Sequence, residues 1–235
     1  MSSRKSNLSS RRVTLKQLAA LGLLGPAGIS GLIQDALAKG DAPALPGINA
    51  LSGSATVNGQ AAKVGTAVKP GDKVATSKGS YVVVVVGKDA FLLRDSTSVI
   101  FEESKTRPGI LENVLIATGK MLSVFDKRAD KGVRIKAASA TIGIRGTGCY
   151  LEIQEARTYF CLCYGEAAID GAGMSQSKII QTTHHESPVW LDDSGGIMKV
   201  EKAGFVNHND DELIMLEKLS GREPPFVKLG LTGKY

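Results

Sequence analysis

Apolar and polar residues alternate in short runs between residues 52 and 170, and turn residues separate the runs. Residues 82–86 are five consecutive valines, whose β-branched side chains favour a strand that is buried on both faces. Residues 133–136 alternate with a period of two, which is typical of a half-buried strand. Asn58 and Gly59 predict a tight hairpin. Turns recur about every ten residues, so the pattern predicts a compact all-β body of many short strands, arranged as a sandwich, barrel or solenoid.

A different pattern begins at the C-terminal end. Asn209 is followed by three acidic residues, which is typical of a helix start because Asn caps free N–H groups and acids suit the helix dipole. Gly221 and two later prolines end the pattern. We predict one short α-helix at about 209–220, within a C-terminal extension of residues 171–235. Its apolar stripe should pack against the β body or beside Trp190, and it comprises Leu213, Met215, Leu216 and Leu219.

The N-terminal segment has the layout of an export signal. Arg11 and Arg12 precede an uncharged, mostly apolar run over residues 18–33, and an Ala-x-Ala pattern ends at Ala38. A positive start, an apolar middle and a small-residue end define a signal peptide. This one resembles the bacterial twin-arginine (Tat) signal, although Thr14 stands where that family usually has Phe.

The signal sets the expected organisation and location. We expect a Tat-type signal peptide over residues 1–38, a linker over 39–51 and a β domain over 52–170. The Tat export machinery is then a partner. The protein is expected in the periplasm, or anchored at the periplasmic face of the inner membrane if the leader is kept. Because the Tat route moves folded proteins, some with a metal already inserted, it is compatible with a bound cofactor.

Charge argues against nucleic acid as a partner. The chain is 43% hydrophobic and 22% charged, with a formal net charge of +6. Five basic residues and one acidic residue give residues 1–38 a net charge of +4, so only +2 remains for the other residues. A nearly neutral body lacks the basic surface that phosphate binding needs. No segment after the leader is apolar over a membrane-spanning length, so we expect a mature form that does not span the membrane.

One stretch carries a resemblance to a known family. Residues 140–148 read Ala-Thr-Ile-Gly-Ile-Arg-Gly-Thr-Gly, and residues 165–169 supply a further glycine turn and strand. With the glycine turns upstream, this resembles FecR-type periplasmic domains over residues 52–170. The resemblance implies a compact all-β fold. Family members that regulate iron uptake add an anti-sigma domain, for which the residues before Leu18 are too few, so we do not expect sigma-factor control.

Arg145 is the first candidate binding residue. Glycines at 143, 146 and 148 bracket it and allow close backbone approach. With Thr147 beside it, the arginine could hold an anionic ligand through a bidentate contact. The alternative is that Arg145 braces a neighbouring turn or an internal acid, because one guanidinium can satisfy several acceptors.

The three cysteines are the second candidate. Cys149, Cys161 and Cys163 lie in a predicted hairpin whose turn centres on Glu155. That register places Cys149 opposite Cys161 and puts all three thiols on one face. A cross-strand disulfide between Cys149 and Cys161 is then within reach. Three thiols on one face also form a candidate site for a soft metal.

All three histidines lie in segments that could complete such a site. His184 and His185 follow the β region, and His208 precedes the predicted helix. A Cys₃His or Cys₂His₂ set suits zinc or iron. The spacing matches no zinc-finger pattern. One disulfide with a free thiol, or three buried thiols that act as small apolar groups, are alternatives that the sequence leaves open.

Two functions follow from these features. The first is an exported, non-enzymatic binding, sensing or scaffold module, with an envelope protein as a candidate partner, because the chain shows no nucleophile elbow, phosphate loop or His-Glu-x-x-His motif. The second is an iron- or zinc-binding or redox protein that uses the cysteines and histidines. The Cys-x-Cys spacing of Cys161 and Cys163 differs from the redox Cys-x-x-Cys motif, which weakens the redox form.

Overall fold

The computed structural model describes residues 29–31, 33, 43–128, 132–155 and 157–234. Arg11, Arg12 and most of the leader lie outside the described residues. Within the described part, the strands form one large sheet with these bounds: β1 Gly47–Ser52, β2 Ala55–Val57, β3 Gln60–Ala61, β4 Lys73–Thr76, β5 Tyr81–Val86, β6 Asp89–Leu93, β7 Ser98–Glu103, β8 Leu111–Thr118, β9 Lys120–Val124, β10 Val133–Lys136, β11 Thr141–Gln154, β12 Arg157–Asp170, β13 Lys178–Thr182, β14 Val189–Asp192 and β15 Lys199–Lys202.

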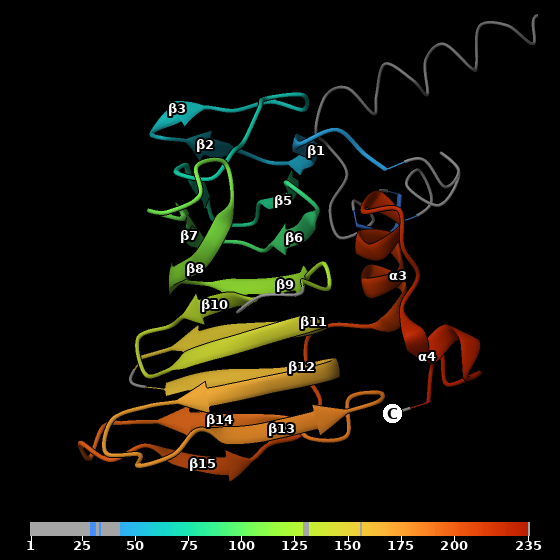
Figure 1. Ribbon diagram of the computed structural model, residues 1–235. Helices are drawn as coiled ribbons and strands as arrows, with labels where there is room; N and C mark the ends of the chain where they lie inside the picture. Colours follow the sequence, from blue (N-terminus) through green and yellow to red (C-terminus); the bar gives the residue numbers. More distant parts are fainter. Residues whose placement is uncertain (1–28, 32, 34–42, 129–131, 156, 235) are drawn as a thin grey trace, which may run out of the picture.

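The long hairpin of β11 and β12 organises the sheet (Figure 1). The first part of β11 pairs with β10 and its second part pairs with β9, so two separate series of strands meet on it. One series continues from β9 through β6 and β5 to β1, and the other from β10 through β8, β7 and β4 to β2 and β3. On the other side, β12 pairs with β14 near its start and with β13 near its end.

The two series of strands face each other and enclose the main core. Phe91 of β6 lies 4.8 Å from Phe101 of β7, centroid to centroid, although the two strands are not neighbours in the sheet. The valine strand β5 shows why both faces are apolar. Val82 and Val84 point into this inner core, whereas Val83 and Val85 point to a second, outer core. The predicted all-β body with a short C-terminal helix is confirmed.

The outer core lies beneath the C-terminal helices α3, Asp210–Leu219, and α4, Pro225–Lys228 (Figure 1). Asn209 caps α3 in a capping box with Glu212, as the sequence predicts. Gly221 ends α3 with a φ of +71°, and its N–H donates to the Lys218 carbonyl. Within the described residues, no helix has both the length and the apolar character that crossing a membrane requires.

The glycines around Arg145 serve close packing. The pairing of β11 with β12 is irregular between Arg145 and Cys149. A Cβ atom at Gly148 would lie 2.5 Å from the Tyr164 ring, and one at Gly165 would lie 2.5 Å from a methyl group of Thr147. Side chains at these two glycines would therefore push the long hairpin apart at its bend.

Candidate metal centre

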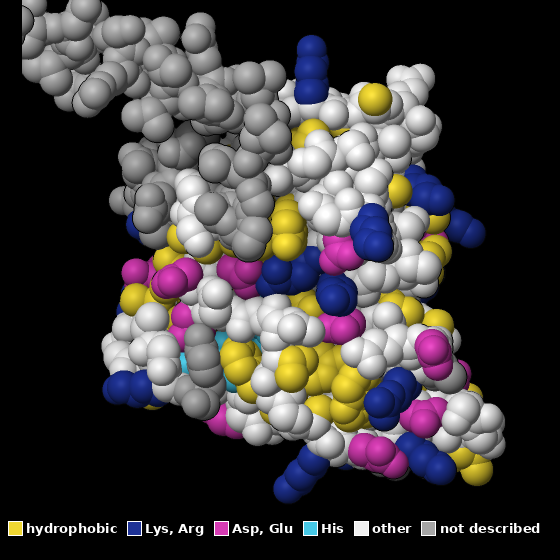
Figure 2. Space-filling model, turned by 180° about the vertical axis from the view of Figure 1, so that it is seen from behind, with side chains coloured by type: hydrophobic (Ala, Val, Ile, Leu, Met, Phe, Trp, Pro, Cys, Tyr) yellow, Lys and Arg dark blue, Asp and Glu magenta, His cyan; other side chains and the backbone are white. Residues whose placement is uncertain are grey.

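Four of the predicted ligands meet at one point of the outer core. Cys161 and Cys163 alternate along β12 and so point to the same face of the sheet. His185 comes from the loop after β13, and His208 from the segment that leads into α3. Their four ligand atoms all lie within 4.8 Å of one another. All four residues are buried, and the histidines reach the face shown in Figure 2 only as small areas.

The hydrogen bonds of the two imidazoles fix where their lone pairs point. His208 Nδ1 lies 2.7 Å from the carbonyl of Val206, and His185 Nε2 lies 3.1 Å from a carboxylate oxygen of Asp210. Both partners accept hydrogen bonds, so these two nitrogens carry the protons. The remaining nitrogens, His185 Nδ1 and His208 Nε2, face each other at 3.2 Å. Two lone pairs at this separation repel unless a proton or a metal ion lies between them.

Two of the distances between the four ligand atoms match those of a tetrahedral site. Metal–nitrogen bonds of about 2.0–2.1 Å and metal–sulfur bonds of about 2.3 Å place two tetrahedral nitrogens about 3.3 Å apart, and a nitrogen and a sulfur about 3.6 Å apart. His185 Nδ1 lies 3.2 Å from His208 Nε2 and 3.6 Å from Cys161 Sγ. The other separations are at most 4.8 Å, so side-chain rotations of the two cysteines would bring all four ligand atoms to one ion.

Asp210 supports the site from behind. Its carboxylate lies 3.0 Å from His184 Nε2 and 3.1 Å from His185 Nε2, and the Gly233 N–H donates to it at 2.7 Å. A carboxylate on the far nitrogen of a ligating histidine orients the ring and makes it a better ligand. His184 therefore contacts Asp210 through Nε2. It is not one of the four residues of the Cys161, Cys163, His185 and His208 cluster.

Local structure holds each histidine in place. His185 has a φ of +59°, a left-handed conformation that is uncommon for a residue other than glycine. Glu186 accepts hydrogen bonds from the backbone N–H groups of Thr183 and His184, which closes this loop. The His208 ring stacks on Tyr150, with 4.7 Å between centroids and 16° between planes. These contacts position both histidines beside the apolar and aromatic side chains of the outer core.

Cys161 differs from the other two cysteines in acidity. A hydrogen bond from the Cys163 thiol favours the Cys161 thiolate and, against the effect of burial, lowers the pKa of Cys161. Burial and the neighbouring Cys161 raise the pKa of Cys163. The pair therefore loses its first proton readily. Burial raises the pKa of Cys149 to about 12. A thiolate is the form that binds a metal.

The predicted position of Cys149 is wrong. Its partner across the hairpin is Leu162, and the partner of Cys161 is Tyr150, because the turn lies between Gln154 and Arg157 and shifts the register by one residue. A shift of one residue moves a side chain to the other face of the sheet. Cys149 therefore points into the inner core, where its sulfur lies 3.3 Å from the Ser123 hydroxyl. All three cysteines are free, and the Cys149–Cys161 disulfide is not formed.

The other predicted pair, Arg145 and Thr147, is not brought together at one surface. Arg145 is exposed and lies 3.7 Å from Glu166 of the neighbouring strand, as the bracing alternative expects. Arg145 also lines an open hollow with Glu166 and Glu186. Thr147 is fully buried, and its methyl group packs against Gly165.

Asp210 is the residue of the centre that sequence analysis missed. Its position in the first turn of a helix gives a sufficient explanation for an acidic residue, so nothing in the sequence singles it out. The signal that could have found it is its place two residues after His208, which brings it to the same end of the helix.

The geometry groups four potential metal ligands in the outer core of an all-β body. No protein-family model matches the sequence, and no curated protein matches it. Two crystal structures named "a putative anti-sigma factor from Parabacteroides distasonis ATCC 8503", at 2.50 and 1.65 Å resolution, each resemble the chain with a TM-score of 0.45 and 10% identity. The matches cover 63% of this chain and 73% and 74% of the other.

Proposed function

We propose that the protein is an exported, non-enzymatic metal-binding module in which Cys161, Cys163, His185 and His208 hold one Zn²⁺ ion. The observation that carries the proposal is the pair of imidazole nitrogens that face each other at 3.2 Å, beside two thiols. Two thiolates balance the charge of Zn²⁺, which matters in a buried site because unbalanced charge is costly there.

Zinc fits the site better than an iron–sulfur cluster. In a two-iron cluster with two Cys and two His ligands, the histidines bind one iron and the cysteines belong to the other. The sulfurs and nitrogens would then lie in separate groups, whereas here the Cys161 sulfur lies 3.6 Å from the His185 nitrogen. Four protein ligands around one ion are typical of a structural zinc site, because a catalytic site keeps one position open.

The proposed ion joins three segments that are far apart in the sequence. Its ligands come from β12, from the loop after β13 and from the segment before α3. Binding therefore fixes the C-terminal segment on the outer face of the sheet, and leaves the rest of the β body available for its proposed binding, sensing or scaffold role with an envelope protein. This arrangement supports a module whose C-terminal segment is stabilised by metal.

Metal analysis with a matched cysteine control tests this function. The full-length protein, purified without added metal, should contain one zinc per chain by mass spectrometry of the metal content. Cys161→Ser and Cys163→Ser should lose the zinc, whereas Cys149→Ser should keep it, because Cys149 points to the other face. Equal zinc loss in all three variants, or a metal-free wild type that gains no zinc on titration, would contradict the proposal. Stoichiometric iron at the same residues would contradict zinc as its metal.

Export through the Tat route is the other part of the proposal. Its support is the leader, with Arg11 and Arg12 before an apolar run, and the need to protect two thiols in an oxidising compartment. Loading the metal before export would provide that protection. Replacing Arg11 and Arg12 together by Lys should retain the protein in the cytoplasm, as shown by fractionation of cells. Periplasmic delivery of that variant would contradict the Tat route and leave the metal proposal unaffected.

A further inference from the structure

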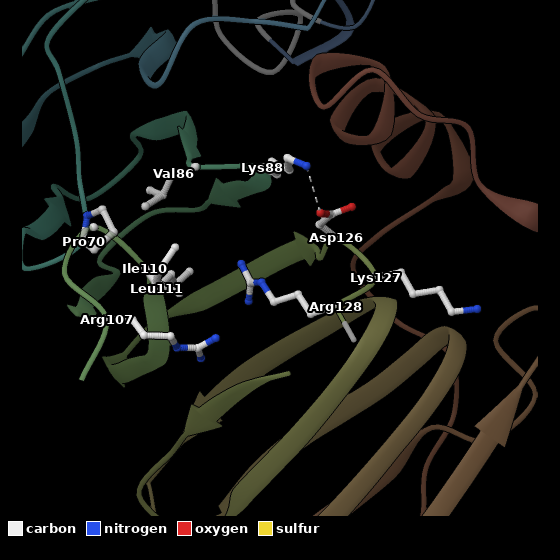
Figure 3. A pocket seen from close by; sticks show the side chains of 11 residues that line it. Pro70, Val86, Lys88, Arg107, Ile110, Leu111, Asp126, Lys127 and Arg128 are labelled. Atoms are coloured by element: carbon white, nitrogen blue, oxygen red, sulfur yellow. Dashed lines mark ion pairs between the residues drawn. The ribbon is translucent and has the colours of Figure 1, made fainter. Parts of the chain in front are cut away.

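A second cavity lies at a different place in the sheet. It has a volume of about 450 Å³, which is within the range of about 300–1,000 Å³ for small-molecule sites. None of the four proposed metal ligands lines it. Its walls come from the turn between β5 and β6, from the loop before β8 and from the segment after β9 (Figure 3). This cavity is therefore separate from the proposed metal centre.

Positive charge dominates the polar lining of this cavity. Four basic residues line it, Lys88, Arg107, Lys127 and Arg128, but the amine of Lys127 points away, which leaves three cationic groups against one acidic residue, Asp126. Asp126 is already engaged, because Lys88 lies 3.8 Å from it and Arg222 lies 3.7 Å from it. In Figure 3 the guanidinium of Arg128 extends into the cavity and Arg107 extends toward it from the other side, whereas Lys127 points away. Basic residues thus outnumber acidic ones in the lining, although Lys88 is paired with Asp126 and Arg128 with Asp89.

Arg128 is held in place by Asp89, and one of its N–H donor groups has no hydrogen-bond partner among the described residues. Its Nη2 donates to the fully buried Asp89, which also accepts the backbone N–H of Asp126 at 2.8 Å. Its Nη1 is shielded from solvent and has no hydrogen-bond partner among the described residues. Buried donors normally have partners, so this unmet donor, on a side chain that is 20% exposed and lines the cavity, suits an acceptor on a ligand once the guanidinium turns toward it. Arg128 is therefore the residue of this cavity most suited to bind an oxygen anion.

The other wall of the cavity is apolar. Pro70, Val86, Ile110 and Leu111 form it, and 40% of the Ile110 surface is exposed. An inorganic anion would leave this wall unused, and a neutral apolar molecule would leave the arginine donor unpaired. A ligand that combines both features would satisfy both sides.

We propose that this cavity binds an organic anion with a carboxylate head and a short aliphatic chain. The carboxylate lies at Arg128, and the chain lies along Ile110 and Leu111. Octanoate is the probe for the test, with acetate and octanol as probes that each lack one half of the ligand. Calorimetric titration of the full-length protein should show octanoate binding at least tenfold more tightly than either.

Three variants locate the binding. Arg128→Gln removes the donor and should weaken octanoate binding at least tenfold. Because it also leaves Asp89 unpaired, Ile110→Glu provides a second variant at an exposed position, where a negative charge should weaken binding to a similar degree. Lys127→Gln is the control for loss of one positive charge, and it should change the affinity less than twofold because Lys127 points away.

The outcomes separate the proposal from general charge attraction. Octanoate binding that is absent, or that Ile110→Glu leaves unchanged, would overturn it. Equal weakening by Arg128→Gln and Lys127→Gln would also overturn it, since binding would then follow net charge. Equal affinity for octanoate and acetate would overturn the role of the apolar wall. The zinc content of the variants should remain that of the wild type.

Discussion

The two faces of the β11–β12 hairpin contain different chemistry. On the inner face, Cys149, Phe160 and Leu162 pack in a core built from apolar side chains of both strand series. On the outer face, Cys161 and Cys163 lie under α3, beside buried histidines and the carboxylate of Asp210. The inner face needs only shape and apolar surface to hold the sheets together. The outer face joins a separate segment through apolar packing and, in addition, through polar contacts that include the four proposed ligands.

The largest expected effect concerns the inner face alone. Phe91 is fully buried between Phe101, at 4.8 Å, and Phe125, at 5.5 Å between ring centroids. Phe91→Ala should lower the free energy of unfolding by about 3–5 kcal/mol, because it removes apolar contacts and leaves a cavity. Urea unfolding measures the loss, and the folded fraction should still contain one zinc per chain. Loss of zinc without loss of stability would show that the two faces are not separate.

Metal removal should affect the outer face. A ligand present at about 100 times its dissociation constant stabilises the folded state by about 2.7 kcal/mol. Removing zinc with a chelator should therefore lower the melting temperature of the wild type and of Cys149→Ser. It should not change that of Cys163→Ser, which is expected to hold no metal. Identical shifts in the two variants would contradict the assignment of the thiols to different faces.

A smaller effect on zinc binding is expected from Asp210, which contacts the proposed ligand His185. Asp210→Asn keeps an oxygen for one partner but removes the charge that faces His184 and His185. Zinc affinity should fall about 10–100-fold, as is usual when the support of a ligating histidine is lost. Asp211→Asn, at the exposed next position of α3, is the matched control and should leave the affinity unchanged. Competition with a zinc-binding dye measures both, and equal losses would show an effect of helix charge only.

Much of the fold could be predicted because its signals are local. The run of five valines predicts a strand that is buried on both faces without knowledge of its neighbouring strands. Asn209 and Glu212 lie three residues apart, so the capping box can also be predicted from a short stretch of sequence. The pairing of β11 with both β9 and β10 could not be predicted in this way. It depends on a bend at Gly146 and Gly148 and on which distant strands pack across the core.

The candidate site was predictable in composition but not in geometry. Cysteine and histidine are uncommon in this chain, so their grouping near the C-terminal end indicates a ligand set. Which thiols belong to it depends on the length of one turn, because a change of one residue exchanges the two faces. Asp210 was missed because its partners, His184 and Gly233, are 26 and 23 residues away in the sequence.

The smallest expected effect tests a buried acid of the outer face that is not a proposed ligand. Glu217 of α3 is 4% exposed, accepts a hydrogen bond from the Tyr164 hydroxyl and pairs with Arg222. Burial raises the pKa of Glu217 above its ordinary value, although Arg222 acts in the opposite direction. The folded state therefore holds this proton more tightly than the unfolded state. The resulting stabilisation is complete below the ordinary pKa of a glutamate, and it is lost as the pH rises through the folded pKa.

Glu217→Gln removes this titration and keeps an oxygen that can accept from Tyr164. As the pH rises above the ordinary range of a glutamate, the wild type should lose stability relative to the variant, as measured by urea unfolding of both proteins at each pH. The comparison cancels contributions that the two proteins share, including the buried Asp89, whose pKa burial also raises. Parallel curves, or a wild type that gains stability relative to the variant, would show that Arg222 and Tyr164 outweigh burial. The outer face would then hold the ionised carboxylate of Glu217 without a metal ion. At Cys161 and Cys163, by contrast, the proposed Zn²⁺ balances the charge of the thiolates.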